Sequence, residues 1–193
     1  MQDFGLYFTL GREHIADLAG YDHILFVTAL CLRYVLQDWK KILILVTAFT
    51  IGHSITLALS VLDYINVSTR WIEFLIPVTI LVTAITNVLQ KNDSQNGRVS
   101  FIYSLALFFG LIHGLGFSNY LKSLLGKDTN IVTELLAFNI GLEVGQLLIV
   151  AAVLLLSVIC IKLLKIQRRD YLLFASGAVF GIAFLMTIER FPN

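Results

Sequence analysis

Residues 134–164 read ELLAFNIGLEVGQLLIVAAVLLLSVICIKLL, and this stretch decides the fold. About 20 mainly apolar residues are enough to cross the hydrocarbon core of a bilayer as a helix. A helix also pairs every backbone amide within the segment, which a bilayer without water requires. The stretch therefore predicts a membrane-spanning helix.

Five further apolar runs, bounded by charged or turn-forming residues, lie on either side of it, at 20–37, 40–62, 70–89, 101–121 and 171–188. The composition agrees, because 58% of the 193 residues are hydrophobic and only 14% are charged, against about a quarter in soluble domains. We predict an all-α, polytopic integral membrane protein with a six-helix bundle over residues 20–193 as its single transmembrane domain.

The stretch 1–19 is too polar to cross, since it contains Arg12, Glu13 and Asp17. Its apolar residues nevertheless recur at helical spacing, namely Phe4, Tyr7, Phe8, Gly11, Ile15 and Leu18. The pattern predicts an amphipathic helix that lies at the membrane interface or caps the bundle.

Charge and cysteine content exclude several classes of protein. The 14 Lys and Arg balance 13 Asp and Glu without a long basic run, so nucleic-acid binding is excluded. Cys31 and Cys160 lie in separate apolar runs and predict neither a disulfide framework nor a thiolate metal site. Lys and Arg are more frequent in the loops at 33–41, 91–98 and 162–169 than in those on the other side, which predicts that both termini lie outside the cell.

Ionisable residues inside predicted spans are functional-site hypotheses, because burying them in lipid costs several kcal/mol. His53, His113 and Glu143 each lie about eight or nine residues from the outer end of their span, roughly 12–14 Å below the outer surface. Asp22 and His23 are shallower on the same side. Imidazole with carboxylate suits a divalent transition metal such as zinc or nickel, and the absence of thiolates argues against Cu(I).

Neighbouring polar residues are predicted to support this site. Asn139, Glu143 and Gln146 make one stripe at i, i+4 and i+7, and Ser54 lies beside His53. Glycines in the same spans allow close helix packing, namely Gly110, Gly114, Gly116, Gly141 and Gly145. The simpler interpretations are packing histidines, a protonated Glu143, an interfacial His14, and Asp22 as a helix cap.

Four motifs occur in order along the chain. They are GxDHILF at 20–26, FTxxHSxTL at 49–57, HGLGF at 113–117 and FNxGxExGQ at 138–146. Together they resemble the HupE/UreJ family of small bacterial membrane proteins, regarded as nickel or cobalt permeases linked to hydrogenase and urease maturation. The resemblance implies an inner-membrane location and metal contacts at Asp22, His23 and His113. It also implies a histidine six positions before the aspartate, whereas His14 precedes Asp22 by eight.

The leading hypothesis is a permease for nickel or cobalt, with zinc as a third ion, that takes the ion from the outer side. Its metal residues would be His14, Asp22, His23, His53, His113 and Glu143, with Ser54, Asn139 and Gln146 behind them. The alternative is a membrane-embedded metal-dependent hydrolase or acyltransferase that uses the same site. A third interpretation is an accessory subunit with a structural metal. The oligomeric state stays open.

Overall fold

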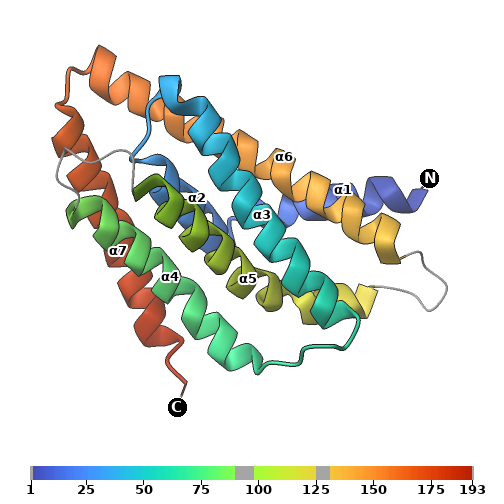
Figure 1. Ribbon diagram of the computed structural model, residues 1–193. Coiled ribbons are helices and arrows are strands. Elements are labelled where there is room, and N and C mark those ends of the chain that lie inside the picture. The colour runs from blue at the N-terminus through green and yellow to red at the C-terminus, as the bar shows by residue number, and fades with distance from the viewer. Residues whose placement is uncertain (1, 90–97, 125–130, 193) are drawn as a thin grey trace.

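The computed structural model describes residues 2–89, 98–124 and 131–192, and this part of the chain is helical without strands (Figure 1). The helices in chain order are α1 Gln2–Ile15, α2 Asp22–Cys31, α3 Trp39–Val61, α4 Thr69–Leu89, α5 Arg98–Leu124, α6 Ile131–Val158 and α7 Arg168–Glu189. A short 3₁₀ turn, Leu36–Asp38, precedes α3, and a π-helical turn, Ile159–Leu163, extends α6.

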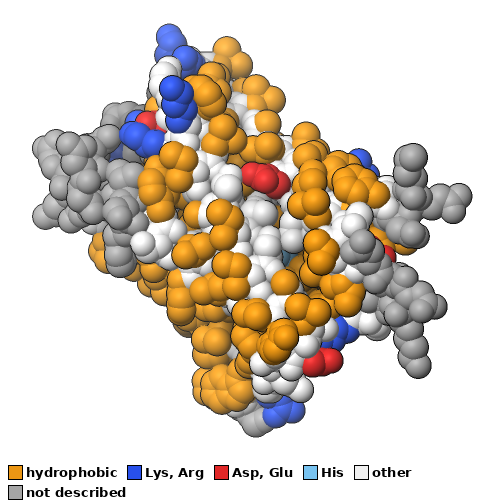
Figure 2. Space-filling view, turned by 45° about the vertical axis from the view of Figure 1, so that its right-hand side comes forward, with side chains coloured by type: hydrophobic (Ala, Val, Ile, Leu, Met, Phe, Trp, Pro, Cys, Tyr) orange, Lys and Arg blue, Asp and Glu red, His pale blue; other side chains and the backbone are white. Residues whose placement is uncertain are grey.

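Five of these helices, α3 to α7, are long and apolar enough to cross a membrane. They correspond to five of the six predicted spans and confirm an all-helical membrane protein. Figure 2 shows hydrophobic side chains over most of one face of the bundle, with Lys and Arg towards its ends. Large apolar side chains such as Leu148, Leu155 and Phe174 are exposed on the bundle, as expected for helices in contact with lipid.

The first predicted span, 20–37, does not form, so the six-helix count is not confirmed. Its helix α2 has 10 residues, which gives a rise of about 15 Å against a hydrocarbon core of about 30 Å. The chain turns after Cys31, and Val35 is extended, with φ −117° and ψ 169°. The backbone N–H of Val35 donates to Asp38 Oδ2 at 3.3 Å, which fixes the turn into α3. Hydropathy detects the apolar residues of 20–37 but does not detect the turn that interrupts the helix.

The stretch 1–19 does form a helix over much of its length, but α1 packs along one side of α6. Tyr7 and Ile15 are buried. Gly11 lies against the backbone of Phe138, and Gly141 lies against the backbone of Phe8. At both glycines a Cβ would overlap the backbone of the neighbouring helix. The predicted placement of an amphipathic helix at the interface is therefore not confirmed.

The helices form three close pairs: α3 with α5, α1 with α6, and α4 with α7 (Figure 1). In the first pair, a Cβ on Gly110 or Gly114 would overlap the backbone oxygen of Phe49 or His53. Small residues allow such close backbone approach between membrane helices. His113 of α5 precedes Gly114 directly. The crossing therefore brings His53 of α3 and His113 of α5 into the interior of the bundle.

Candidate metal centre

A break between the two short helices creates the site. α1 ends at Ile15 and α2 begins at Asp22, so His14 lies in the last turn of one helix and Asp22 and His23 in the first turn of the next. Non-helical backbone within a membrane bundle is tolerated where it lines a cavity. Residues 16–21 do so, because Ala16, Asp17, Leu18 and Gly20 line a cavity of the structure.

All four histidines of the chain converge at this break. The ring centroids of His14 and His23 lie 4.6 Å apart, and those of His23 and His113 lie 5.0 Å apart. His53 lies 6.0 Å from His14 and 6.3 Å from His23. One ligand nitrogen from each of His14, His23 and His53 lies within 4.8 Å of the others. Imidazoles from α1, α2, α3 and α5 thus meet in one cluster.

Most of the imidazole nitrogens in the cluster have no hydrogen-bond partner among the described residues. His53 is fully buried and both its ring nitrogens are unpartnered, as are Nε2 of His14 and Nε2 of His23. His113 contacts Thr79 Oγ1 through Nε2 at 3.1 Å, while its Nδ1 is unpartnered. A buried polar atom without a partner costs about 1–3 kcal/mol. Such a set fits a ligand-binding role better than a packing role.

Asp22 holds the cluster from one side. Its Oδ1 lies 3.1 Å from Nδ1 of His23, and its Oδ2 accepts a hydrogen bond from Arg190 Nη1 at 3.2 Å. Burial alone would raise the pKa of Asp22, but the hydrogen bond and electrostatic interaction with His23, the electrostatic interaction with His113 and the hydrogen bond from Arg190 outweigh it and hold this pKa well below its ordinary range. A carboxylate bonded to Nδ1 of a histidine orients the ring and leaves Nε2 for a metal.

The surroundings of His14 favour the neutral form of its imidazole, which is the form that binds metal ions. Burial, together with the neighbouring imidazoles of His23 and His53, lowers the pKa of His14 well below its ordinary value. Metal ions bind the neutral form of imidazole, so no proton needs to leave His14 at neutral pH.

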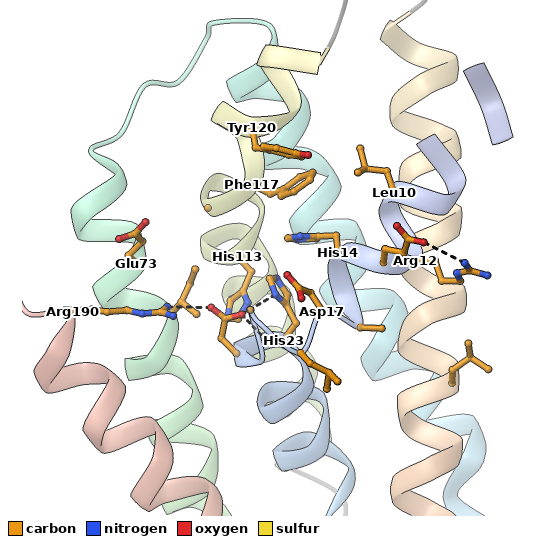
Figure 3. Close-up of a pocket in the computed structure, with 18 residues that line it drawn as sticks. Leu10, Arg12, His14, Asp17, His23, Glu73, His113, Phe117, Tyr120 and Arg190 are labelled. Atoms are coloured by element: carbon orange, nitrogen blue, oxygen red, sulfur yellow. Dashed lines mark hydrogen bonds and ion pairs between the residues drawn. The ribbon is translucent and has the colours of Figure 1, made fainter. Parts of the chain in front are cut away.

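A cavity of about 1130 Å³ connects the cluster with the surface. Among the lining residues, His14, His23 and His113 belong to the cluster, while the acidic residues Glu13 and Glu73 are exposed. Figure 3 shows the labelled histidines facing this space, with Phe117 beside His14. The ring centroids of those two residues lie 3.9 Å apart. The site is therefore accessible to a small ion from one end of the bundle.

The structure does not bring Glu143 into the cluster. Its Oε1 accepts a hydrogen bond from Thr47 Oγ1 at 2.9 Å on the seam between α3 and α6. Thr47 precedes His53 by six residues, about 9 Å along the helix axis. The sequence places Glu143 at the same depth as His53 and His113, counted from the predicted ends of their spans. Depth along a helix does not define which face of the helix a residue occupies. Glu143 therefore lies apart from the histidines.

The three predicted supporting residues lie on or beside the same seam. Gln146 Oε1 accepts a hydrogen bond from Thr50 Oγ1 at 2.8 Å. Ser54 donates to the carbonyl oxygen of Thr50 at 2.6 Å, and Asn139 donates to that of Leu135 at 2.8 Å. None of these hydrogen bonds reaches the imidazoles.

Two residues at the site were not among those predicted. Thr79 contacts His113, and it begins a polar stripe on α4 with Thr83 that its i, i+4 spacing could have indicated. Arg190 reaches Asp22 across 168 residues of sequence. No local pattern marks such a contact.

A bundle of apolar helices around clustered imidazoles defines a polytopic membrane protein with a histidine cluster that could hold a metal ion. A family model described as HupE / UreJ protein matches residues 1–190. The chain therefore belongs to the HupE/UreJ family, which confirms the resemblance and makes it a membrane protein of metal-transporter type. Searches among curated proteins and solved structures found no match.

Family membership also bears on the spacing of His14. The seven residues between His14 and Asp22 are the last residue of α1 and the turn at 16–21. This turn brings the His14 ring to 4.6 Å from that of His23. The longer spacing therefore does not separate the two imidazoles.

Proposed function

We propose that this protein is a permease for a divalent transition metal, with nickel or cobalt as the first candidates and zinc as the third. His14, His23 and His53 would bind the ion, and His113 and Asp22 would stand beside them. The observation that carries the proposal is the convergence of imidazoles with unpartnered nitrogens at the inner end of an open cavity. We further propose that the protein resides in a bacterial inner membrane with both termini outside.

The donor set supports an ion of this class. Neutral imidazoles suit nickel, cobalt and zinc, whereas magnesium and calcium prefer oxygen ligands. A tetrahedral ion with bonds of about 2.0–2.1 Å needs its nitrogens about 3.4 Å apart. The three ligand nitrogens already lie within 4.8 Å of one another, so small movements of the side chains would bring them to the spacing of a bound ion.

The surroundings of the cluster support transport from one side at a time. On the side away from the cavity, His113 packs against Phe26 and Phe49, with ring centroids 5.1 and 5.2 Å away. Phe26 also contacts Phe109 at 5.7 Å, and all three phenylalanines are buried. This aromatic layer closes the path beyond the cluster. In the proposed orientation, this arrangement supports an outward-open state that would have to rearrange before the ion leaves.

The test is uptake of Ni²⁺, Co²⁺ and Zn²⁺ into proteoliposomes that contain a metal-sensitive dye. Wild type should accumulate at least one ion, and His53→Ala should lose at least nine-tenths of the rate. Glu143→Gln should keep uptake within about twofold of wild type, since Glu143 lies outside the cluster. Uptake by wild type no faster than in protein-free liposomes would refute the permease.

One observation favours the alternative, a membrane-embedded hydrolase or acyltransferase. The cavity, at about 1130 Å³, is as large as pockets that hold organic ligands, about 300–1,000 Å³. Three imidazoles with an open position can also activate water on zinc. Zinc-dependent cleavage of an activated ester by wild type, lost in His53→Ala and without ion uptake, would support this function instead.

A further inference from the structure

The ion pair between Asp22 and Arg190 spans the cavity beside the imidazole cluster. Asp22 begins α2, and Arg190 follows directly after α7. The Nη1 to Oδ2 distance is 3.2 Å, and only 8% of the surface of Asp22 is exposed. Figure 3 shows the Arg190 side chain reaching from α7 toward the cluster, with a dashed line to this carboxylate.

We propose that Arg190 is an internal counterion that neutralises Asp22 in the metal-free protein. The incoming divalent cation displaces Arg190 from Asp22. The proposal rests on the proposed function, because it assumes that the cation binds at the imidazoles. It adds Arg190 as a positioning residue that weakens metal binding and thereby keeps it reversible.

The electrostatics of the pair carry this inference. A carboxylate that is only 8% exposed needs a compensating charge, and a guanidinium supplies one at every pH a cell meets. His23 Nδ1 lies 3.1 Å from the same carboxylate, so an ion on His23 brings two positive charges close to Arg190. The cation and the guanidinium then repel each other and compete for one carboxylate.

The end of α7 next to Arg190 is held against α4 by an aromatic contact. The ring of Phe191 packs on that of Phe74 of α4, with centroids 5.4 Å apart. The ion pair therefore connects the α4/α7 pair with the first turn of α2. Displacement of Arg190 would remove this connection while the contact between α4 and α7 stays in place.

Arg12 provides a matched control for the charge. It lines the same cavity, but its guanidinium lies 3.7 Å from Glu13, in a pair that is 45% and 66% exposed on its two sides. Arg12→Gln removes the same charge from the cavity wall without touching Asp22. A general effect of cavity charge would therefore show equally in both variants.

The experiment measures the dissociation constant of purified protein for whichever of Ni²⁺, Co²⁺ and Zn²⁺ wild type binds most tightly. We expect Arg190→Gln to bind about five- to tenfold more tightly, as for an ordinary coupling between sites, Arg190→Lys to lie closer to wild type, and Arg12→Gln to change by less than twofold. In the Asp22→Asn background, Arg190→Gln should add nothing. A merely structural Arg190 would instead weaken binding when removed.

Three results would overturn the inference while leaving the permease intact: unchanged or weaker binding by Arg190→Gln, an equal gain in Arg12→Gln, or a gain that persists in Asp22→Asn. Failure of folded wild type to bind any of the three ions would refute the proposed metal function itself, and with it the role of Arg190.

Discussion

At the scale of single residues, the buried histidines lower the stability of the metal-free protein. His53 is buried with two unpartnered nitrogens, although Leu57 and Phe49 on the same helix are buried without such a cost. Selection for packing alone would favour an apolar residue at this position. The arrangement is understandable if the nitrogens bind an ion, because binding supplies their missing partner.

We therefore expect His53→Leu to raise the thermal midpoint of the metal-free protein. Removal of unpartnered buried nitrogens should stabilise it by about 1–3 kcal/mol, or a few degrees for a chain of this size. His113→Leu is the matched control, since it loses the contact with Thr79 and should not be stabilised. Thermal melts in detergent with and without Ni²⁺ measure both effects. A lower midpoint for metal-free His53→Leu would show that the imidazole packs rather than binds.

The sequence pointed to each histidine of the cluster but not to all their partners. His14, Asp22, His23, His53 and His113 were predicted as site residues from their unusual place in apolar segments, and the structure brings them together. Glu143 was grouped with them by depth, yet it pairs with Thr47. Depth follows from counting residues along a helix, whereas helix rotation depends on tertiary packing, which the sequence does not display.

At the scale of helices, glycine contacts hold the site in register. The α3/α5 and α1/α6 pairs both have backbone against backbone at a glycine. These contacts belong to segments that were predicted as helices with small residues for close approach. The segment 20–37 was predicted as a span but forms a short helix followed by a turn. Contacts with distant residues support this turn, such as the hydrogen bond from Arg168 Nη2 to the carbonyl oxygen of Arg33 at 2.7 Å.

Substitution at the α3/α5 crossing should separate the helices and destroy the site. In Gly114→Ala the new Cβ would overlap the backbone oxygen of His53, and overpacking of this kind costs about 1–3 kcal/mol. We expect a lower thermal midpoint and weaker metal binding. Gly181→Ala on α7 is the control, because nothing lies within 4 Å of its added Cβ. Equal midpoints for the two variants would contradict a packing role for Gly114.

At the scale of the whole molecule, the loop charges predict which end of the bundle faces outward. The cavity is lined by Glu73 near the start of α4 and by Arg190 directly after α7. These helix ends lie at one end of the bundle, and the basic loop between α6 and α7 lies at the opposite end (Figure 1). Hydropathy was sufficient to predict five spans, whereas the orientation from the loop charges stays a prediction. The broken first segment could not be predicted, because a short helix that stops inside the bundle has the same composition as a span.

Labelling with a membrane-impermeant maleimide tests this orientation. In a background with Cys31 and Cys160 replaced by serine, Tyr64→Cys should react in intact spheroplasts, since Tyr64 is 76% exposed between α3 and α4. Leu164→Cys, at a position 62% exposed after α6, should react only after the membrane is opened. The reverse pattern would place the cavity on the cytoplasmic side and make the protein an exporter by geometry.

The most direct test of the metal centre is X-ray absorption spectroscopy of the purified protein loaded with one equivalent of Ni²⁺ or Zn²⁺. We expect a first shell of nitrogen and oxygen without sulfur, at about 2.0–2.1 Å for zinc, and outer-shell scattering from three imidazoles, falling to two in His53→Ala. A first shell of oxygen alone, or a spectrum that His53→Ala leaves unchanged, would contradict a metal centre built from the converging histidines.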